Sequence, residues 1–109
     1  MKGKIVLIPF PFTDLTSAKL RPALVLVESE KDCVVAFISS RVPTEPSSTE
    51  ILIREDHEEF ARTGLKRASV VRLDKVATIS KDLMLGEIGE LGDALRREIN
   101  TKLREAYHL

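Results

Sequence analysis

The chain has 109 residues, of which 43% are hydrophobic and 31% are charged. This length and composition predict one globular domain over residues 1–109 and disfavour a disordered chain. Because basic and acidic residues number 17 each, the chain lacks the overall positive charge that is typical of proteins that bind duplex nucleic acid. Only a local cluster of cations could bind a polyanion.

The first residues predict a strand. Residues 4–9 are rich in β-branched side chains and end at a proline, which is typical of a short strand. Two prolines and the lack of a small-residue cleavage site argue against a signal peptide. No apolar run is long enough to span a bilayer. We therefore expect a cytoplasmic protein without a membrane segment.

A loop is predicted at residues 10–20, before a strand at residues 22–28 whose residues up to Val27 form a continuous apolar run. Such a run is typical of a strand that is buried on both faces. Pro22 is able to open this strand but not to stand in its middle, because proline donates no ladder hydrogen bond. The next apolar run forms a hairpin with it. Paired positions in this hairpin sum to about 61, which places Arg21 roughly opposite Ser40.

The rest of the chain predicts more short strands and one terminal helix. In order, the pattern predicts a strand at 50–53, a helical turn that ends at Gly64, two strands that divide residues 68–80 near Asp74 and Lys75, and an edge strand at 85–91. Asp93 is the expected N-cap of a helix with Leu95, Ile99, Leu103 and Ala106 on one face. Short strands followed by one amphipathic helix predict a mainly β fold of the α+β class, a small bent barrel with a C-terminal helix.

Residues that commonly hold metals or act as nucleophiles form no recognisable site. Cys33 lies in an apolar run, which favours a buried thiol over a reactive one. His57 and His108 lie far apart and lack the spacing of metal ligands. The acidic residues around His57 favour a solvated helix start over a cation site, and His57 itself stays open as a general base. We expect no metal and no cofactor.

Three other features could carry chemistry. Pro22 biases the backbone of Arg21 towards an extended conformation, so that the guanidinium extends from a rigid strand end. Ser39 and Ser40 end the strand that pairs with this one, and Arg72 and Asp74 lie two residues apart on one strand face. The alternative from spacing alone is that Arg72 and Asp74 form a surface ion pair and that the serines merely end a strand.

The sequence resembles the MazF/PemK family of toxin endoribonucleases from bacterial toxin–antitoxin pairs. The resemblance covers "GKIVLIPFPFTDLTSAKLRPALVLV", "AFISS", "TGLKRASVVRLDKVATIS" and "IGEL", followed by the final helix. The Arg-Pro strand and the later "GL…SVVRLDK…TI" stretch are specific in combination, in that order and at that distance. The resemblance implies a compact SH3-like β-barrel with a C-terminal helix, and a homodimer.

The family's activity is metal-independent, sequence-specific cleavage of single-stranded RNA that leaves a 2′,3′-cyclic phosphate and a 5′-OH. By position, Arg21 matches the family's catalytic arginine, and Ser39 stands where many members have a catalytic threonine or serine. Arg72 and Asp74 match the Arg-x-Asp of the plasmid-borne branch. The resemblance also implies a cognate antitoxin, MazE-like or of another type, and DNA would be reached only through that antitoxin.

Further residues are candidates for RNA contacts. Phe12 could stack on unpaired bases, whereas Phe10 is expected to pack into the barrel mouth. The remaining candidate substrate-binding residues are Lys19, Ser40, Arg41, Lys66 and Arg67.

The chain departs from the family pattern at three places, one of which is "SSR" at residues 39–41, where other members have "Thr-Ser-Gln" or similar. Many members have an acidic residue at the position of Lys4, and many have a glutamate or glutamine in the loop that here reads "TSAK". An alternative function follows from these departures: a catalytically weak or inactive toxin-like protein that binds another target, such as gyrase.

Overall fold

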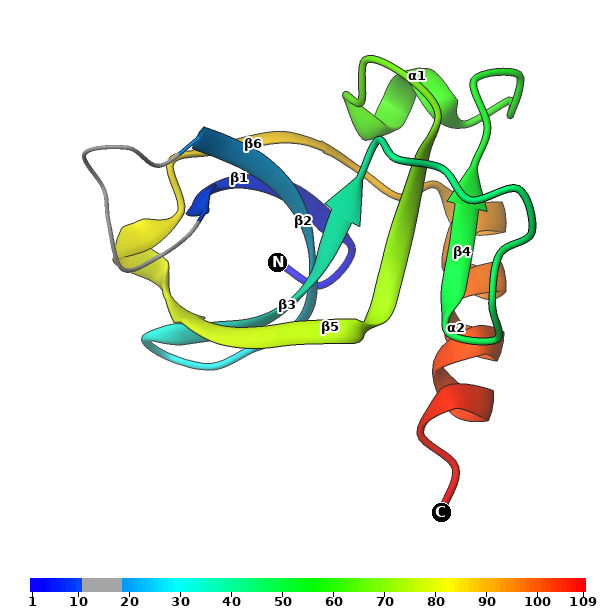
Figure 1. Cartoon of the computed structure of the whole chain (residues 1–109). Helices are drawn as coiled ribbons and strands as arrows, with labels where there is room; N and C mark the ends of the chain where they lie inside the picture. The colour runs from blue at the N-terminus through cyan, green and yellow to red at the C-terminus, as the bar shows by residue number, and fades with distance from the viewer. Residues whose placement is uncertain (11–18) are drawn as a thin grey trace.

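The computed structural model describes residues 1–10 and 19–109, and its strands form one curled antiparallel sheet with helices beside it (Figure 1). The elements are β1 (Lys4–Phe10), β2 (Lys19–Glu28), β3 (Asp32–Ser39), β4 (Glu50–Ile53), α1 (Phe60–Thr63), β5 (Ser69–Ser80), the 3-10 helix η1 (Lys81–Leu83), β6 (Gly86–Glu90) and α2 (Asp93–Ala106). The sheet order is β4-β5-β3-β2-β1-β6. The predicted mainly β fold with a C-terminal helix is confirmed as a half-barrel, with β6 as an edge strand.

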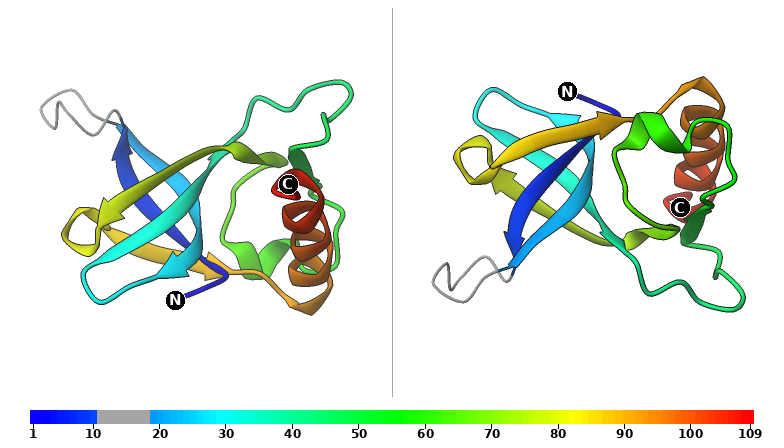
Figure 2. Two further views of the ribbon diagram at one scale, coloured as in Figure 1. Left: turned by 90° about the horizontal axis from the view of Figure 1, so that it is seen from below. Right: turned by 90° about the horizontal axis from the view of Figure 1, so that it is seen from above.

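The curled sheet separates two hydrophobic clusters. One face packs against α2, where Leu95 and Ile99 join Leu24 in a buried cluster, and we call it the helix face. The other face, the barrel face, buries Ala23 and Val25 in a second cluster. Neighbouring residues of β2 therefore enter different clusters, which confirms that the centre of this strand is buried on both sides. Figure 2 shows α2 running beside the barrel rather than across its mouth.

The start of β2 differs from the prediction. Pairing with β1 extends to Phe10 opposite Lys19, so the strands continue into the predicted loop, and Pro22 lies inside β2 opposite Leu7. Pairing with β3 begins only at Ala23. Pro22 thus lies where β2 has a partner strand on one side only, which is an edge-like position that tolerates proline. The predicted β2–β3 register is confirmed within one residue, because paired positions sum to 60 or 61.

β5 is one strand, so the predicted division near Asp74 and Lys75 is wrong. A register shift occurs there instead: Phe37 of β3 pairs with Arg72, but the preceding Ala36 pairs with Val76. The residues between these two β5 positions have no partner on β3, and β5 bends sharply, as Figure 1 shows. Such an insertion is a β-bulge, which bends the strand without ending it.

α1 ends at a local glycine, whereas the N-terminus of α2 is held by a residue far away in the sequence. Gly64 ends α1 in the left-handed conformation at a φ of 73°, as predicted. Asp93 is not the N-cap of α2, which is Gly92, and no side chain of its own caps the helix. The Glu59 carboxylate instead accepts hydrogen bonds from the backbone N–H groups of Ala94 and Leu95, at 3.0 and 2.8 Å. These bonds lower the pKa of Glu59.

Candidate active-site groove

Strand register brings the main candidate residues to one face of the sheet. Ile8 of β1 lies opposite Arg21 of β2. Ala23, on the same side of β2 as Arg21, lies opposite Phe37, and Phe37 lies opposite Arg72. Because side chains alternate along a strand, the pairings place all of these residues on the barrel face.

Except for Ala23, these residues line a groove of about 460 Å³ beside the barrel-face cluster. The groove is lined by Ile8, Phe10, Arg21, Phe37, Ile38, Ser39, Ser40, Arg41, Arg72 and Lys75. Five candidate site residues predicted from the sequence, Arg21, Ser39, Ser40, Arg41 and Arg72, thus lie together. They come from three strands and the segment that follows β3.

An aromatic pair forms part of the groove wall. The rings of Phe10 and Phe37 meet edge to face, with centroids 5.4 Å apart and planes at 69°, a favourable aromatic geometry. Phe10 packs at the barrel mouth, as expected, and is still 43% exposed. Its ring therefore presents an apolar surface beside the groove cations.

The groove is rich in positive charge. Four of its residues, Arg21, Arg41, Arg72 and Lys75, are cationic, and none of the described residues that line it is acidic. Within the described part of the chain, Arg72 is the one groove cation with a carboxylate neighbour: its Nε lies 4.0 Å from Oε2 of Glu50. At that distance the buried Nε makes no hydrogen bond among the described residues.

Two polar contacts organise the segment beside the groove. The backbone N–H of Arg41 donates to Oγ of Ser39 at 3.1 Å, so this hydroxyl acts as an acceptor and keeps its own hydrogen for another partner. The other carboxylate oxygen of Glu50, Oε1, accepts from the backbone N–H of Ser47 at 2.9 Å. Glu50 thus joins the segment after β3 to the guanidinium of Arg72.

Other candidates lie elsewhere. Asp74 is exposed in the bulge of β5 and does not line the groove, and the contacts among the described residues include no ion pair between Asp74 and Arg72. Lys19, Lys66 and Arg67 are exposed outside the groove lining. Phe12 and residues 16–18 of the "TSAK" loop lie outside the described residues. Lys75 lines the groove and was missed, because the bulge that brings it there leaves no signal in the sequence.

The structure also shows whether the described residues form metal-binding groups or membrane-spanning helices, and it places Cys33 and His57. Within residues 1–10 and 19–109, no group of three or more histidine, cysteine, aspartate or glutamate side chains could hold a metal ion. In the same residues, no helix is long and apolar enough to cross a membrane. Cys33 is buried, as predicted, and burial raises the pKa of its thiol. His57 accepts a hydrogen bond at Nδ1 from the backbone N–H of Glu59, outside the groove.

Comparisons with known proteins identify the fold and family. A family model described as the PemK-like, MazF-like toxin of type II toxin–antitoxin systems matches residues 1–107. An endoribonuclease in complex with its cognate antitoxin from a mycobacterial species is 19% identical, with a TM-score of 0.75 over 100% of this chain and 95% of that one. The Mycobacterium tuberculosis toxin MazF-mt6 is 23% identical, with a TM-score of 0.74 over 97% of each chain. An Mtb toxin is 25% identical, with a TM-score of 0.66 over 80% of this chain and 92% of that one. A search of curated proteins gave no match.

Proposed function

This chain belongs to the PemK-like, MazF-like toxin family of type II toxin–antitoxin systems, and we propose that it is an endoribonuclease that cleaves single-stranded RNA without a metal ion. Family members are generally endoribonucleases. The observation that carries the proposal for this chain is the groove, where Arg21, Ser39 and Arg72 converge without an acidic residue among the described lining.

The proposed reaction is an internal transesterification. The 2′-OH of the RNA attacks the adjacent phosphorus, a new O2′–P bond forms, and the P–O5′ bond breaks. The 2′-OH loses a proton and the leaving 5′ oxygen gains one, so the products are a 2′,3′-cyclic phosphate and a 5′-OH. Because the nucleophile belongs to the substrate, the protein has to orient the phosphate and stabilise the charge of the transition state.

The groove residues suit this task. Arg21 offers a planar set of donors that matches phosphate oxygens. Ser39 retains a hydroxyl hydrogen for the same oxygens. Arg72 supplies a second guanidinium, whose Nε makes no hydrogen bond within the described part of the chain. Preorganised donors of this kind each contribute roughly 3–4 kcal/mol to lowering a barrier. Asp74 lies outside the groove lining, so this proposal assigns it no step of the reaction.

RNA binding extends beyond the scissile phosphate. In this proposal Ser40 and Arg41 contact the RNA within the groove, and an unpaired base stacks on Phe10 or Phe12, which contributes about 1–3 kcal/mol per base. Lys19, Lys66 and Arg67 contact the RNA backbone outside the groove. Recognition by stacking and phosphate contacts requires a single strand, because paired bases are not accessible to aromatic rings.

The proposed partner is a cognate antitoxin. One structural neighbour was solved in complex with its cognate antitoxin, and the cationic groove suits an acidic segment that folds on binding. We further propose that the toxin is a cytoplasmic homodimer and contacts DNA only through the antitoxin.

The proposal is tested with a long single-stranded RNA in excess EDTA. Purified wild-type protein is compared with Arg21→Ala, and the cut ends are mapped and their termini identified. We expect discrete cuts with 5′-OH ends from the wild type and none from the variant. Cuts that need a divalent cation would contradict the mechanism. No cuts by a folded wild-type protein would instead favour the alternative, a toxin-like protein that binds another target.

A further inference from the structure

Lys75 reaches the groove through the bulge of β5. From Arg72 on the barrel face, simple alternation would place Asp74 on that face and Lys75 on the other. Beyond the bulge, however, Ala77 and Ile79 pack into the barrel-face cluster. Counted back from Ala77, the residue on the barrel face is Lys75. The groove lining agrees with this count, because it includes both Arg72 and Lys75 but not Asp74.

The bulge has fixed anchors, so the placement of Lys75 is specified by the fold. The backbone N–H of Leu73 donates to the carbonyl of Thr49 at 2.8 Å. The Leu73 carbonyl accepts a hydrogen bond from the hydroxyl of Tyr107, just after α2. The Leu73 side chain is fully buried in the helix-face cluster. With its side chain and both backbone polar groups engaged, Leu73 holds the bend that turns Lys75 towards the groove.

We propose that Lys75 is a substrate-binding residue that contacts a phosphate of the RNA other than the one held by Arg21. The proposal rests on the proposed function. β3 lies between β2 and β5, so Arg21 and Lys75 project from strands about 10 Å apart along the sheet. Cations on two walls of one groove fit successive phosphates of a single strand. A lysine is a point charge without the fork of arginine, which suits backbone binding more than the orientation of one phosphate.

The proposal is tested by the salt dependence of binding. The probe is a set of 2′-O-methylated copies of the RNA, which the proposed reaction cannot cleave because the nucleophile is blocked. Each phosphate contact on a single strand contributes about 0.7 to the slope of log K against log salt. We expect Lys75→Gln to make this negative slope shallower by about 0.7, and so to weaken binding about 4-fold at 150 mM salt and 8-fold at 50 mM.

Lys31→Gln is the matched control. Lys31 is exposed just before β3, whereas the groove lies at the other end of this strand, so its removal changes the net charge equally without touching the groove. We expect Lys31→Gln to keep the wild-type slope and Lys75→Arg to restore it. In the nuclease assay, Lys75→Gln should raise KM and keep kcat.

The outcomes separate the two proposals. If the wild type cuts and binds RNA but Lys75→Gln and Lys31→Gln have the same slope, the role of Lys75 is wrong and the proposed function stands. If the wild type neither binds nor cuts, RNA is not the substrate and both proposals fall. Lys75 is exposed, so the variant is expected to fold, and its thermal unfolding checks this.

Discussion

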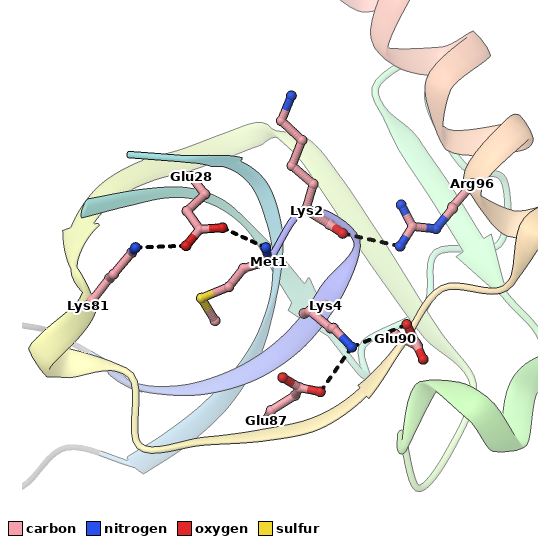
Figure 3. Close-up of polar contacts among 8 residues, drawn as sticks. All are labelled: Met1, Lys2, Lys4, Glu28, Lys81, Glu87, Glu90 and Arg96. Carbon is pink, nitrogen blue, oxygen red and sulfur yellow. Dashed lines mark hydrogen bonds and ion pairs between the residues drawn. The ribbon is translucent and has the colours of Figure 1, made fainter. Parts of the chain in front are cut away.

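The groove and the edge formed by β1, β6 and η1 carry similar cations in opposite surroundings. At this edge, which we call the charge-paired edge, Nζ of Lys4 lies 3.3 Å from carboxylate oxygens of both Glu87 and Glu90, and Nζ of Lys81 lies 2.7 Å from Glu28 (Figure 3). In the groove, Arg21, Arg41 and Lys75 have no carboxylate partner among the described residues. A chain with no net charge thus holds a local concentration of positive charge.

From this difference in charge pairing we expect the phosphates of RNA to bind in the groove rather than at the charge-paired edge. Bonds with Glu87 and Glu90 raise the pKa of Lys4, and the bond to Lys4 lowers that of Glu90, so each charge at the edge is already compensated. A phosphate there would have to compete with carboxylates, whereas at Arg21, Arg41 and Lys75 it would meet none among the described residues. Lys4, a departure from the family pattern, therefore serves the β1–β6 pairing and lies outside the groove lining.

Arg21→Lys is expected to have the largest effect of the predictions below, a fall in kcat/KM, and a second arginine-to-lysine change serves as its control. Arg21→Lys keeps the charge of the groove but loses the fork that fits a phosphate, and we expect kcat/KM to fall about 10²-fold. Arg96→Lys is the control outside the groove, on α2, where a guanidinium nitrogen donates to the carbonyl of Lys2 at 3.2 Å. We expect it to keep the wild-type kcat/KM. Equal losses of kcat/KM in the two variants would show that an arginine in the groove matters no more for cleavage than one outside it.

Arg72 is the groove cation that has a carboxylate neighbour, Glu50, and substitution of Glu50 tests whether this contact matters. Glu50 is only 15% exposed at its side chain and is held by Ser47, so its carboxylate limits the positions open to Arg72. We expect Glu50→Gln to lower kcat/KM about 5-fold, because contacting residues commonly couple by about 1 kcal/mol.

A double-mutant cycle with Arg72→Ala is the measurement for Glu50. If Glu50 acts through Arg72, its replacement has little further effect once Arg72 is absent, whereas a purely structural role would add in full. Additive losses, or a fall in the unfolding midpoint without a fall in kcat/KM, would show that Glu50 does not position Arg72.

Local patterns predicted much of the fold and part of the site. The apolar run of β2, the glycine that ends α1 and the apolar face of α2 are all set by residues close in sequence. The hairpin register of β2 and β3 follows from a short turn, and it brings Arg21 and Ser39 to one groove. Such features are readable because the interactions that fix them span few residues.

Contacts between distant residues explain the errors. Asp93 is a good N-cap by type, but the Glu59 carboxylate, from a different part of the chain, occupies the N-terminus of α2. The prediction that Asp74 shares a face with Arg72 assumed an unbroken strand, and the bulge exchanges Asp74 for Lys75. That bulge is hydrogen-bonded to Thr49 and Tyr107, which no local pattern connects to β5.

Tyr107 provides a smaller test of the groove, because it contacts the bulge that carries Lys75. Tyr107→Phe removes the hydrogen bond to the Leu73 carbonyl and leaves the ring in place, so we expect the free energy of unfolding to fall by about 1 kcal/mol. Urea unfolding measures this loss. Because a looser bulge holds Lys75 less firmly, RNA binding should weaken slightly, and a stability loss with no change in the salt slope would show that the bend persists without this bond.

The smallest effect at neutral pH is expected at the charge-paired edge. Hydrogen bonds from Lys81 and the N-terminal amine of Met1 lower the pKa of Glu28 from its ordinary 4.5 to about 2. Because the folded state holds the proton less tightly than the unfolded state, this carboxylate stabilises the fold fully above pH 4.5. The contribution is lost as the pH falls towards 2.

Lys81→Met removes the larger cause of this shift. An NMR titration should then show the pKa of Glu28 higher, though still below 4.5, because the bond from Met1 remains. Urea unfolding between pH 5 and 2 should depend less on pH than in the wild type. Cleavage at pH 7 should be unchanged, because Lys81 does not line the groove. A loss of cleavage in this variant would mean that the charge-paired edge also takes part in function.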